Sequence, residues 1–270
     1  MNLPNIKIVD IKSLISHETA NQLRTRKIKQ QLVRASMQRD PIIVGIKKKT
    51  KVILDGANRF SAINELKASH VLVQLIKYES KDLKLLRWNH LVQNVPVKIL
   101  LSRLKSLSNI KLISTNPAQA TKLLKTGKSI LTLNFINKQV YSVINNYHQP
   151  IAEQIRMAVD NYNSHKIVRV ANNNFSELKK LYPQATMHVI FPQFTKNNIW
   201  LFAQNKHLLP AGVTRFILPS RAKQVNAPLS KLTSIDTLYS KNKWLSSYIQ
   251  KLINQESVRR YDEPTIYYND

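Results

Sequence analysis

Two acidic residues, Glu18 and Asp55, lie where side chains could perform phosphate chemistry. Asp55 ends the apolar run 52–54 and is followed by Gly56, one of four glycines in 270 residues. A strand that turns on a glycine into a helix leaves unpaired backbone N–H groups at the helix start, and these groups can hold phosphate. The pattern fits an oxyanion site, although Asp-Gly after a strand is more often a simple turn.

The residues around Asp55 suggest what each group would do. The backbone amides of Gly56, Ala57, Asn58 and Arg59 would point at a bound oxyanion, and the Arg59 side chain would add positive charge. Asp55 could hold a magnesium ion that bridges phosphates, because this hard cation takes oxygen ligands and usually one or two carboxylates. Taken alone, the position of Glu18 is more typical of a glutamate that is stabilised by a helix start.

The elements that must position these residues form a compact unit before residue 80. Alternating apolar and polar residues predict a half-buried strand, and apolar residues at helical spacing predict an amphipathic helix ended by Asp40-Pro41. The expected order is strand 5–15, helix 19–37, a hairpin of strands 42–46 and 52–54, helix 58–67 and strand 71–76.

Longer helical patterns follow Asp82, and we expect a domain boundary within residues 79–95. Trp88 is expected on the apolar face of the first of these helices. The predicted elements are helices 83–95 and 100–107, a hairpin over 129–143, a helix over 150–162, strands 187–194 and 198–210, a loop over 210–232 and a terminal helix over 237–255. The predicted fold class is therefore mixed α/β, of the α+β kind.

Composition narrows the possible functions. Forty-two Lys and Arg against fifteen Asp and Glu leave a formal charge of +27, a field that attracts DNA, RNA, nucleotides or anionic lipid surfaces. A lysine-rich solvated surface explains the same excess. The sequence has no cysteine, which excludes disulfides, thiolate catalysis and Cys-ligated metal sites. The seven histidines form no H-x-H or H-x-x-x-H pair, so no built-in metal cage is expected.

The sequence predicts a cytoplasmic protein without a membrane span. No apolar run approaches the roughly 20 residues needed to cross a bilayer. The N-terminal residues carry charges where a signal peptide would need an uninterrupted apolar segment.

Several motifs in chain order resemble the ParB/sulfiredoxin-like domain and, within that superfamily, the free serine kinases. That family includes ADP-dependent archaeal enzymes and the ATP-dependent enzyme that supplies O-phospho-L-serine for staphyloferrin B, a siderophore. Matching segments span nearly the whole chain, in order: His17-Glu18, Asp55-Gly56-Ala57-Asn58-Arg59, Trp88-Asn89-His90, Gly212-Val213-Thr214-Arg215-Phe216 and Arg260-Tyr261-Asp262-Glu263-Pro264.

The resemblance implies phosphoryl transfer from ATP or ADP, with magnesium, to the hydroxyl of free L-serine. It implies that Glu18 is the catalytic base and that Asp55 organises metal and phosphates. It also implies that residues 56–59 bind the polyphosphate. Trp88, Thr214 and Arg215 would line the amino-acid pocket. It implies a nucleotide-binding domain over 1–92 and a substrate-binding, partly helical domain over 93–270.

Two positions depart from the family pattern. Asn58 and Phe216 stand where the relatives commonly have histidine. An asparagine amide can still donate a hydrogen bond, whereas phenylalanine cannot. Substrate choice or activity could therefore differ from that of the relatives, down to a binding protein without catalysis.

Two other functions follow from the same superfamily. A ParB-like DNA-binding regulator agrees with the charge of +27. The Gly-Glu-Arg-Arg box of ParB proteins is replaced here by Gly56-Ala57-Asn58-Arg59, which favours the kinase. A sulfiredoxin-like reductase needs a catalytic cysteine and is excluded.

Overall fold

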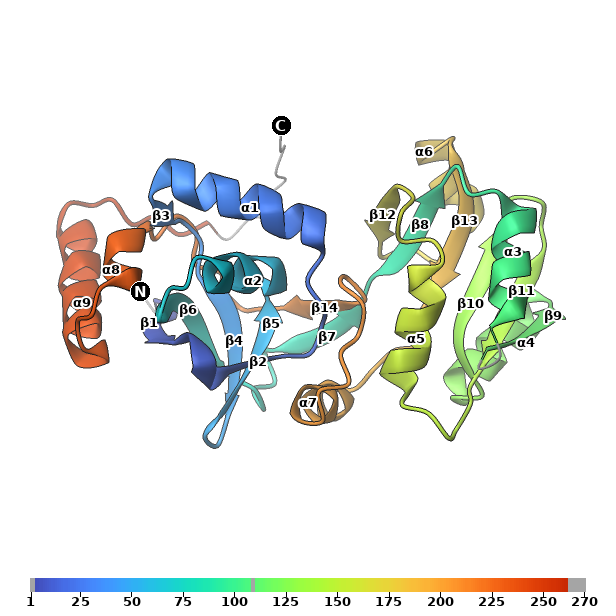
Figure 1. Ribbon diagram of the computed structural model, residues 1–270, viewed down its shortest axis with the longest axis horizontal. Helices are drawn as coiled ribbons and strands as arrows, with labels where there is room; N and C mark the ends of the chain where they lie inside the picture. The colour runs from blue at the N-terminus through green and yellow to red at the C-terminus, as the bar shows by residue number, and fades with distance from the viewer. Residues whose placement is uncertain (1–2, 108–109, 262–270) are drawn as a thin grey trace.

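A computed structural model describes residues 3–107 and 110–261 and shows two β-sheets side by side, each covered by helices (Figure 1). The first sheet has the strand order β1-β6-β4-β5-β2, and the second has the order β12-β8-β13-β10-β11-β9. The prediction of a mixed α/β fold is confirmed. In the described part of the chain, no helix is both long and apolar enough to span a membrane.

The first sheet carries the predicted strand, helix and hairpin unit. Its strands are β1 (Asn5–Asp10), β2 (Leu14–Ser16), β4 (Ile42–Lys47), β5 (Thr50–Asp55) and β6 (His70–Lys77). Helices α1 (Gln22–Ala35) and α2 (Ala57–Glu65) pack against each other on one face of this sheet (Figure 1). Leu32 and Ile63 are buried beneath them against strand residues such as Val44 and Ile53.

The predicted strand 5–15 is interrupted at Asp10. The Asp10 side chain accepts a hydrogen bond from the Lys12 N–H at 2.8 Å and starts a short 3-10 turn, η1 (Ile11–Ser13). The chain then re-enters the sheet as β2, which runs parallel to β5 with Ser16 beside Ile53. Glu18 therefore lies just beyond the carboxyl end of β2, and Asp55 forms the carboxyl end of the neighbouring parallel strand β5.

The second sheet is antiparallel throughout. Its strands are β8 (Asn89–Gln93), β9 (Lys111–Thr115), β10 (Ser129–Phe135), β11 (Val140–Ile144), β12 (Ile167–Val170) and β13 (Ala185–Ile190). Its helices are α3 (Val97–Ser106), α4 (Pro117–Lys125), α5 (Ile151–Asp160) and α6 (Phe175–Leu181). The predicted hairpin over 129–143 and the helix over 150–162 are confirmed, and the strand predicted over 187–194 is present as β13, which ends at Ile190.

Three predicted elements are wrong. Residues 83–95 form β7 (Lys84–Arg87) and β8 instead of a helix. Every residue of β8 is buried, so its sequence lacks the alternation that marks a strand. Residues 198–210 were expected to be a strand but belong largely to α7 (Lys196–Gln204), which begins with a capping box between Thr195 and Asn198. The expected loop 210–232 contains β14 (Thr214–Ile217) and α8 (Leu229–Thr233).

A ribbon of β7 and β14 lies between the two sheets (Figure 1). One hydrophobic core runs through this junction and includes Leu54 from the first sheet, Leu131 from the second and Phe216 from β14. The contact surface between the two sheets is thus filled with buried apolar side chains.

The chain returns to the first sheet at its C-terminal end. The confirmed terminal helix α9 (Leu238–Asn254) packs on β1, where Asn242 bonds both the N–H and the carbonyl of Ile8. The small pair β3 (Met37–Gln38) and β15 (Ala227–Pro228) joins the same region. A domain division at residue 92 stays a prediction; the pairings place β8 in the second sheet and α9 against the first.

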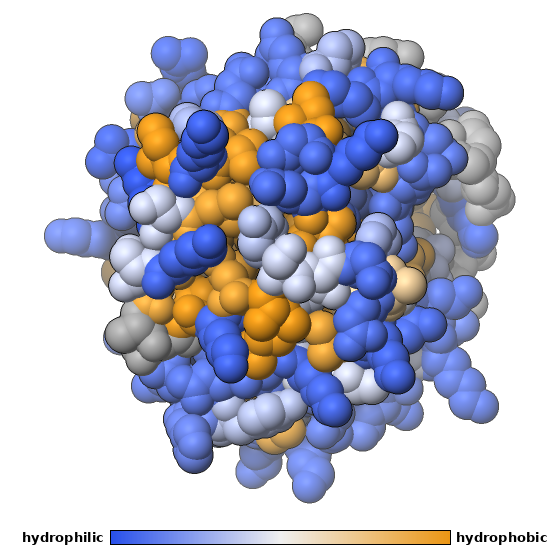
Figure 2. All heavy atoms as spheres, turned by 90° about the vertical axis from the view of Figure 1, so that its right-hand side faces the viewer, coloured by the Kyte–Doolittle hydropathy of each residue, from blue (hydrophilic) through white to orange (hydrophobic). Residues whose placement is uncertain are grey.

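The end of the molecule away from the first sheet exposes apolar side chains. Figure 2 shows them gathered among polar residues on the face where α3, α4 and β9 lie. Ile99 of α3, for example, is half exposed. This face belongs to the far side of the second sheet and is separate from the region around Glu18 and Asp55.

Candidate active site

The carboxylate of Glu18 is held by the segment that precedes β14. Its Oε2 accepts the N–H of Gly212 at 3.1 Å, and its Oε1 accepts the N–H of Thr214 at 2.9 Å and the Thr214 hydroxyl at 2.6 Å. The Glu18 side chain is 14% exposed. Three donors therefore fix the carboxylate in one orientation, with one oxygen carrying a single hydrogen bond from the described residues.

A short parallel bridge brings Glu18 to this segment. The Leu209 N–H donates to the His17 carbonyl at 2.9 Å, and the Thr19 N–H donates to the Leu209 carbonyl at 2.8 Å. These bonds join residues almost 200 positions apart in the sequence. These backbone hydrogen bonds bring Glu18 next to the segment that contains Thr214.

Asp55 ends β5, and Gly56 starts α2 with a left-handed backbone (φ +101°). Helix α2 begins at Ala57, one residue before the predicted start. The Asp55 carboxylate forms an ion pair with Arg221. Burial alone would raise the pKa of Asp55, but the charge and hydrogen bond of Arg221, the charge of Arg59 and the Gly56 N–H outweigh it and lower the pKa. Asp55 is therefore a carboxylate at neutral pH.

Arg59 and Asn58 already have partners within the protein. The Arg59 Nη1 donates to the Pro41 carbonyl at 2.8 Å. The Asn58 Oδ1 accepts the N–H of Asn21 at 2.7 Å and so joins the start of α2 to the residue that caps α1. The amide NH₂ of Asn58 remains as the donor that this side chain could offer to a ligand.

The three residues expected to line the amino-acid pocket lie together, Thr214 and Arg215 on β14 and Trp88 directly after β7. The guanidinium of Arg215 lies over the ring of Trp88 at 4.3 Å from its centroid, a cation–π contact. The Trp88 N–H donates to the Val213 carbonyl at 2.9 Å, next to Thr214. Trp88, Thr214 and Arg215 are thus neighbours, and Thr214 ties them to Glu18.

Phe216 is a core residue in this structure. Its ring is buried and meets the ring of His17 edge-on at 5.8 Å between centroids. Its side chain therefore packs beneath Glu18.

Two arginines outside the sequence motifs, Arg169 and Arg24, add positive charge near this region. Arg169 of β12 lies where a Cβ of Gly212 would be, so its guanidinium is close to the backbone that holds Glu18. Burial and the nearby charge of Arg24 lower the pKa of Arg169, and Glu18 and Asp55 act in the opposite direction. Arg169 therefore lies within the electrostatic reach of both carboxylates, and Arg24 of α1 lies within reach of Arg169.

No sequence signal marks these two arginines. Arg169 occupies an ordinary position in the short strand 167–170, and Arg24 is one of several basic residues in α1. Their proximity depends on the pairing of β12 with β8 and on the docking of one sheet against the other. Both are long-range features.

His90 belongs to the motif segment Trp88-Asn89-His90, and its side chain also contacts the Gly212 segment. Its Nε2 lies 3.2 Å from the Gly212 carbonyl, and its Nδ1 lies 3.1 Å from the Tyr162 hydroxyl. Burial lowers the pKa of His90 to about 3. His90 is neutral at pH 7, donating to Gly212 and accepting from Tyr162. The remaining motif residues 262–264 lie outside the described residues.

Gly212→Ala should disturb the site in two ways, through strain in the left-handed backbone and through a clash of the added Cβ with Arg169. Gly212 has φ +83°, and an added Cβ would overlap the Arg169 guanidinium. We expect about 1–3 kcal/mol of lost stability from the left-handed backbone, together with displacement of Arg169 and of the N–H that binds Glu18. The matched control is Gly127→Ala, because Gly127 also has a left-handed backbone (φ +69°) but open space around the added Cβ.

Thermal unfolding of both glycine variants, compared with ligand binding, checks this expectation. Both should lose similar backbone stability, whereas only Gly212→Ala should lose binding of adenine nucleotide or of L-serine. Equal binding by the two variants would contradict the placement of Gly212 in the site.

The site fits a magnesium ion held mainly by its ligand's phosphates. Among the described residues, no three His, Asp or Glu side chains gather to form a metal cage. Magnesium commonly keeps several waters and binds through one or two carboxylates plus substrate phosphates. Asp55, a half-exposed carboxylate, is the residue suited to that role.

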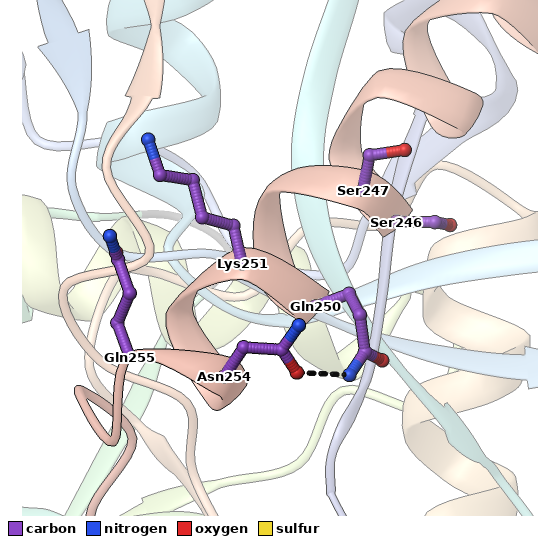
Figure 3. Close-up of a pocket in the computed structure, with 6 residues that line it drawn as sticks. All are labelled: Ser246, Ser247, Gln250, Lys251, Asn254 and Gln255. Atoms are coloured by element: carbon purple, nitrogen blue, oxygen red, sulfur yellow. Dashed lines mark hydrogen bonds between the residues drawn. The ribbon is translucent and has the colours of Figure 1, made fainter.

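Two surface hollows lie apart from this site. Figure 3 shows one of about 590 Å³, and all six of its lining side chains come from α9 and the residue after it. Gln250 and Asn254 hydrogen bond to each other there at 2.9 Å. The other, of about 270 Å³, lies between α3 and the end of α5. Neither includes Glu18, Asp55 or their partners.

Comparison with known proteins defines the fold. No protein family model and no curated protein sequence matches the chain. The chain shares its fold with nucleotide-bound free serine kinase structures. A glutamate-to-glutamine variant in complex with AMP matches with a TM-score of 0.73 and 14% identity, over 86% of this chain and 95% of the other.

Two further structures have the same fold. SbnI from Staphylococcus aureus, solved with a C-terminal truncation, matches with a TM-score of 0.70 and 20% identity, over 92% of this chain and 97% of the other. A conserved hypothetical protein from Pyrococcus furiosus matches with a TM-score of 0.71 and 14% identity, over 86% of this chain and 99% of the other.

Proposed function

We propose that this protein is a kinase that phosphorylates free L-serine to O-phospho-L-serine with ATP or ADP. The observation that carries the proposal is the Glu18 carboxylate, fixed by Gly212 and Thr214 beside Trp88 and Arg215 and within electrostatic reach of Arg169. A fixed carboxylate is suited to accept a hydroxyl proton, and the neighbouring arginines are suited to bind carboxylate and phosphate.

The fold supports the same function. Structures with this fold include a free serine kinase in complex with AMP and variants of a glutamate residue in complex with AMP or ADP. For this chain, the amides of residues 56–59 at the start of α2 would bind the nucleotide phosphates. Glu18 and Asp55 lie at the carboxyl ends of adjacent parallel strands, so the base and the phosphate site would lie at the same edge of the sheet.

The proposed reaction has one bond-forming and one bond-breaking step. The serine Oγ forms a bond with the terminal phosphorus, the phosphoanhydride P–O bond breaks, and the serine proton passes to Glu18. ADP leaves as the second product when ATP is the donor, and AMP leaves when ADP is the donor. Arg215 would hold the serine carboxylate, and Arg169 and Arg24 would stabilise charge on the transferring group. Bound magnesium, held by Asp55, would neutralise phosphate charge.

The direct test is incubation of the protein with L-serine, magnesium chloride and either nucleotide. ³¹P NMR should show O-phospho-L-serine together with ADP or AMP in equal amounts. D-serine is the matched control, because it carries the same hydroxyl with its carboxylate misplaced for Arg215. Absence of product with both nucleotides, when the protein is folded and binds nucleotide, would refute the kinase.

DNA binding was the alternative raised by the sequence. The charge of +27 is the observation that favours DNA binding, and no contact among the described residues gives it further support. Serine phosphorylation is therefore the function that we carry forward.

A further inference from the structure

His17 is buried directly beneath Glu18, and each of its ring nitrogens faces one oxygen atom. Nδ1 lies 2.7 Å from the carbonyl oxygen of Ile53 on β5, and Nε2 lies 2.8 Å from the Thr214 hydroxyl on β14. The residue is 2% exposed. The two protein oxygens therefore decide which nitrogens of the ring carry protons.

The hydrogen bonds around His17 can be counted proton by proton. The Ile53 carbonyl can only accept, so Nδ1 must donate to it. The Thr214 hydroxyl has a single proton and two neighbours, Glu18 Oε1 at 2.6 Å and His17 Nε2 at 2.8 Å. With a neutral imidazole and an ionised carboxylate, both neighbours would need that proton. One more proton satisfies all contacts when it lies on Nε2.

His90 provides an internal comparison, because its surroundings need no additional proton. One of its nitrogens also faces a carbonyl, that of Gly212, and the other faces a hydroxyl, that of Tyr162. The Tyr162 hydroxyl can donate to the ring, so a neutral His90 forms both bonds. At His17 the neighbouring hydroxyl differs, because Thr214 donates its single proton to the Glu18 carboxylate and has none left for the ring.

The groups packed around His17 are compatible with a positive ring. Glu18 Oε1 lies 3.7 Å from Nε2. Phe216 of β14 meets the ring edge-on and is uncharged. Asp55 lies two residues beyond Ile53 on β5 and is a carboxylate. The Arg169 guanidinium lies against Gly212, and its charge interacts with that of Glu18.

We propose that His17 is a positioning residue that works as an imidazolium, donating from both nitrogens so that the Thr214 hydroxyl turns to Glu18 Oε1. This inference rests on the proposed kinase function, and it identifies His17 as the residue that orients the hydrogen bonds of the general base, Glu18. Glu18 Oε2, which carries the Gly212 N–H alone among the described residues, is then left for the serine hydroxyl. The serine proton passes to Oε2, and the His17 proton stays in place.

NMR of ¹⁵N-histidine-labelled protein tests the protonation state without requiring catalysis. At pH 7, His17 should show two protonated ring nitrogens and His90 one, with His17→Gln used to assign the His17 signals. A single protonated nitrogen on His17 would overturn the inference. Thr214→Val should remove the second proton, because its methyl cannot accept from Nε2.

Kinetics test the consequence for the base. Loss of the donor that faces the Thr214 hydroxyl should release Thr214 from Glu18 and lower kcat. His17→Gln keeps an amide N–H that can donate to Thr214, so it should retain kcat within about 10-fold, with KM for serine little changed. His17→Ala should lose kcat by about 100-fold at every pH.

Equal kcat values for His17→Gln and His17→Ala would overturn the inference while O-phospho-L-serine is still formed. Failure of the wild-type protein to form any O-phospho-L-serine would instead refute the kinase, and the NMR measurement would still report the state of His17.

Discussion

Glu18→Gln is expected to lower kcat for O-phospho-L-serine formation by roughly 10³-fold, within the range attributed to general base catalysis. Glutamine preserves the size of the side chain and one oxygen, which can still accept from either Gly212 or Thr214, but it cannot accept a proton at neutral pH. Because the nucleotide is expected at the start of α2, its Kd should change by less than about threefold. Stopped assays of phosphoserine and calorimetry with ADP separate the two effects.

Glu153→Gln is the matched control for this variant. Glu153 lies at the start of α5 and pairs with His207 at 3.0 Å, so the substitution removes one carboxylate from the second half of the chain. It should leave kcat within about twofold of the wild type. If Glu18→Gln were to behave in the same way, another residue would have to serve as the base.

The sequence predicts those parts of the fold whose signals are local. The hairpin of β4 and β5 follows from two apolar runs around a basic turn, and the start of α2 follows from Gly56, whose left-handed backbone the structure confirms. Strand β8 was missed because a fully buried strand has no alternation. Helix α7 was missed because its apolar residues outweighed the Thr195 capping signal.

The same distinction holds for the candidate site: residues in local motifs could be predicted, and residues brought in by long-range contacts could not. The motif residues Trp88, Thr214 and Arg215 could be named because they lie in recognisable segments, and the structure brings them together with Glu18. Their roles remain proposals. The positions of Arg24 and Arg169 depend on how strands pair and sheets dock across more than 100 residues, and a single sequence carries no record of that contact.

Arg169→Ala is expected to lower kcat by roughly 10²- to 10³-fold, the cost of removing one preorganised donor from a developing charge. Its guanidinium lies against Gly212, near the carboxylate that would receive the serine proton, and comes from a different sheet than Asp55. KM for serine should change less than kcat, because Arg215 is the residue placed to hold the serine carboxylate. Arg169→Lys should recover part of the loss.

Arg103→Ala controls for the loss of one positive charge, since Arg103 is exposed on α3. It should leave kcat unchanged, and a similar loss in both variants would show a general effect of net charge.

The double variant Gly212→Ala with Arg169→Ala tests the contact between these two residues. Removing the guanidinium vacates the space that the added Cβ needs, so the two substitutions should cost less stability together than the sum of their separate effects. Strict additivity would contradict the contact between Arg169 and Gly212.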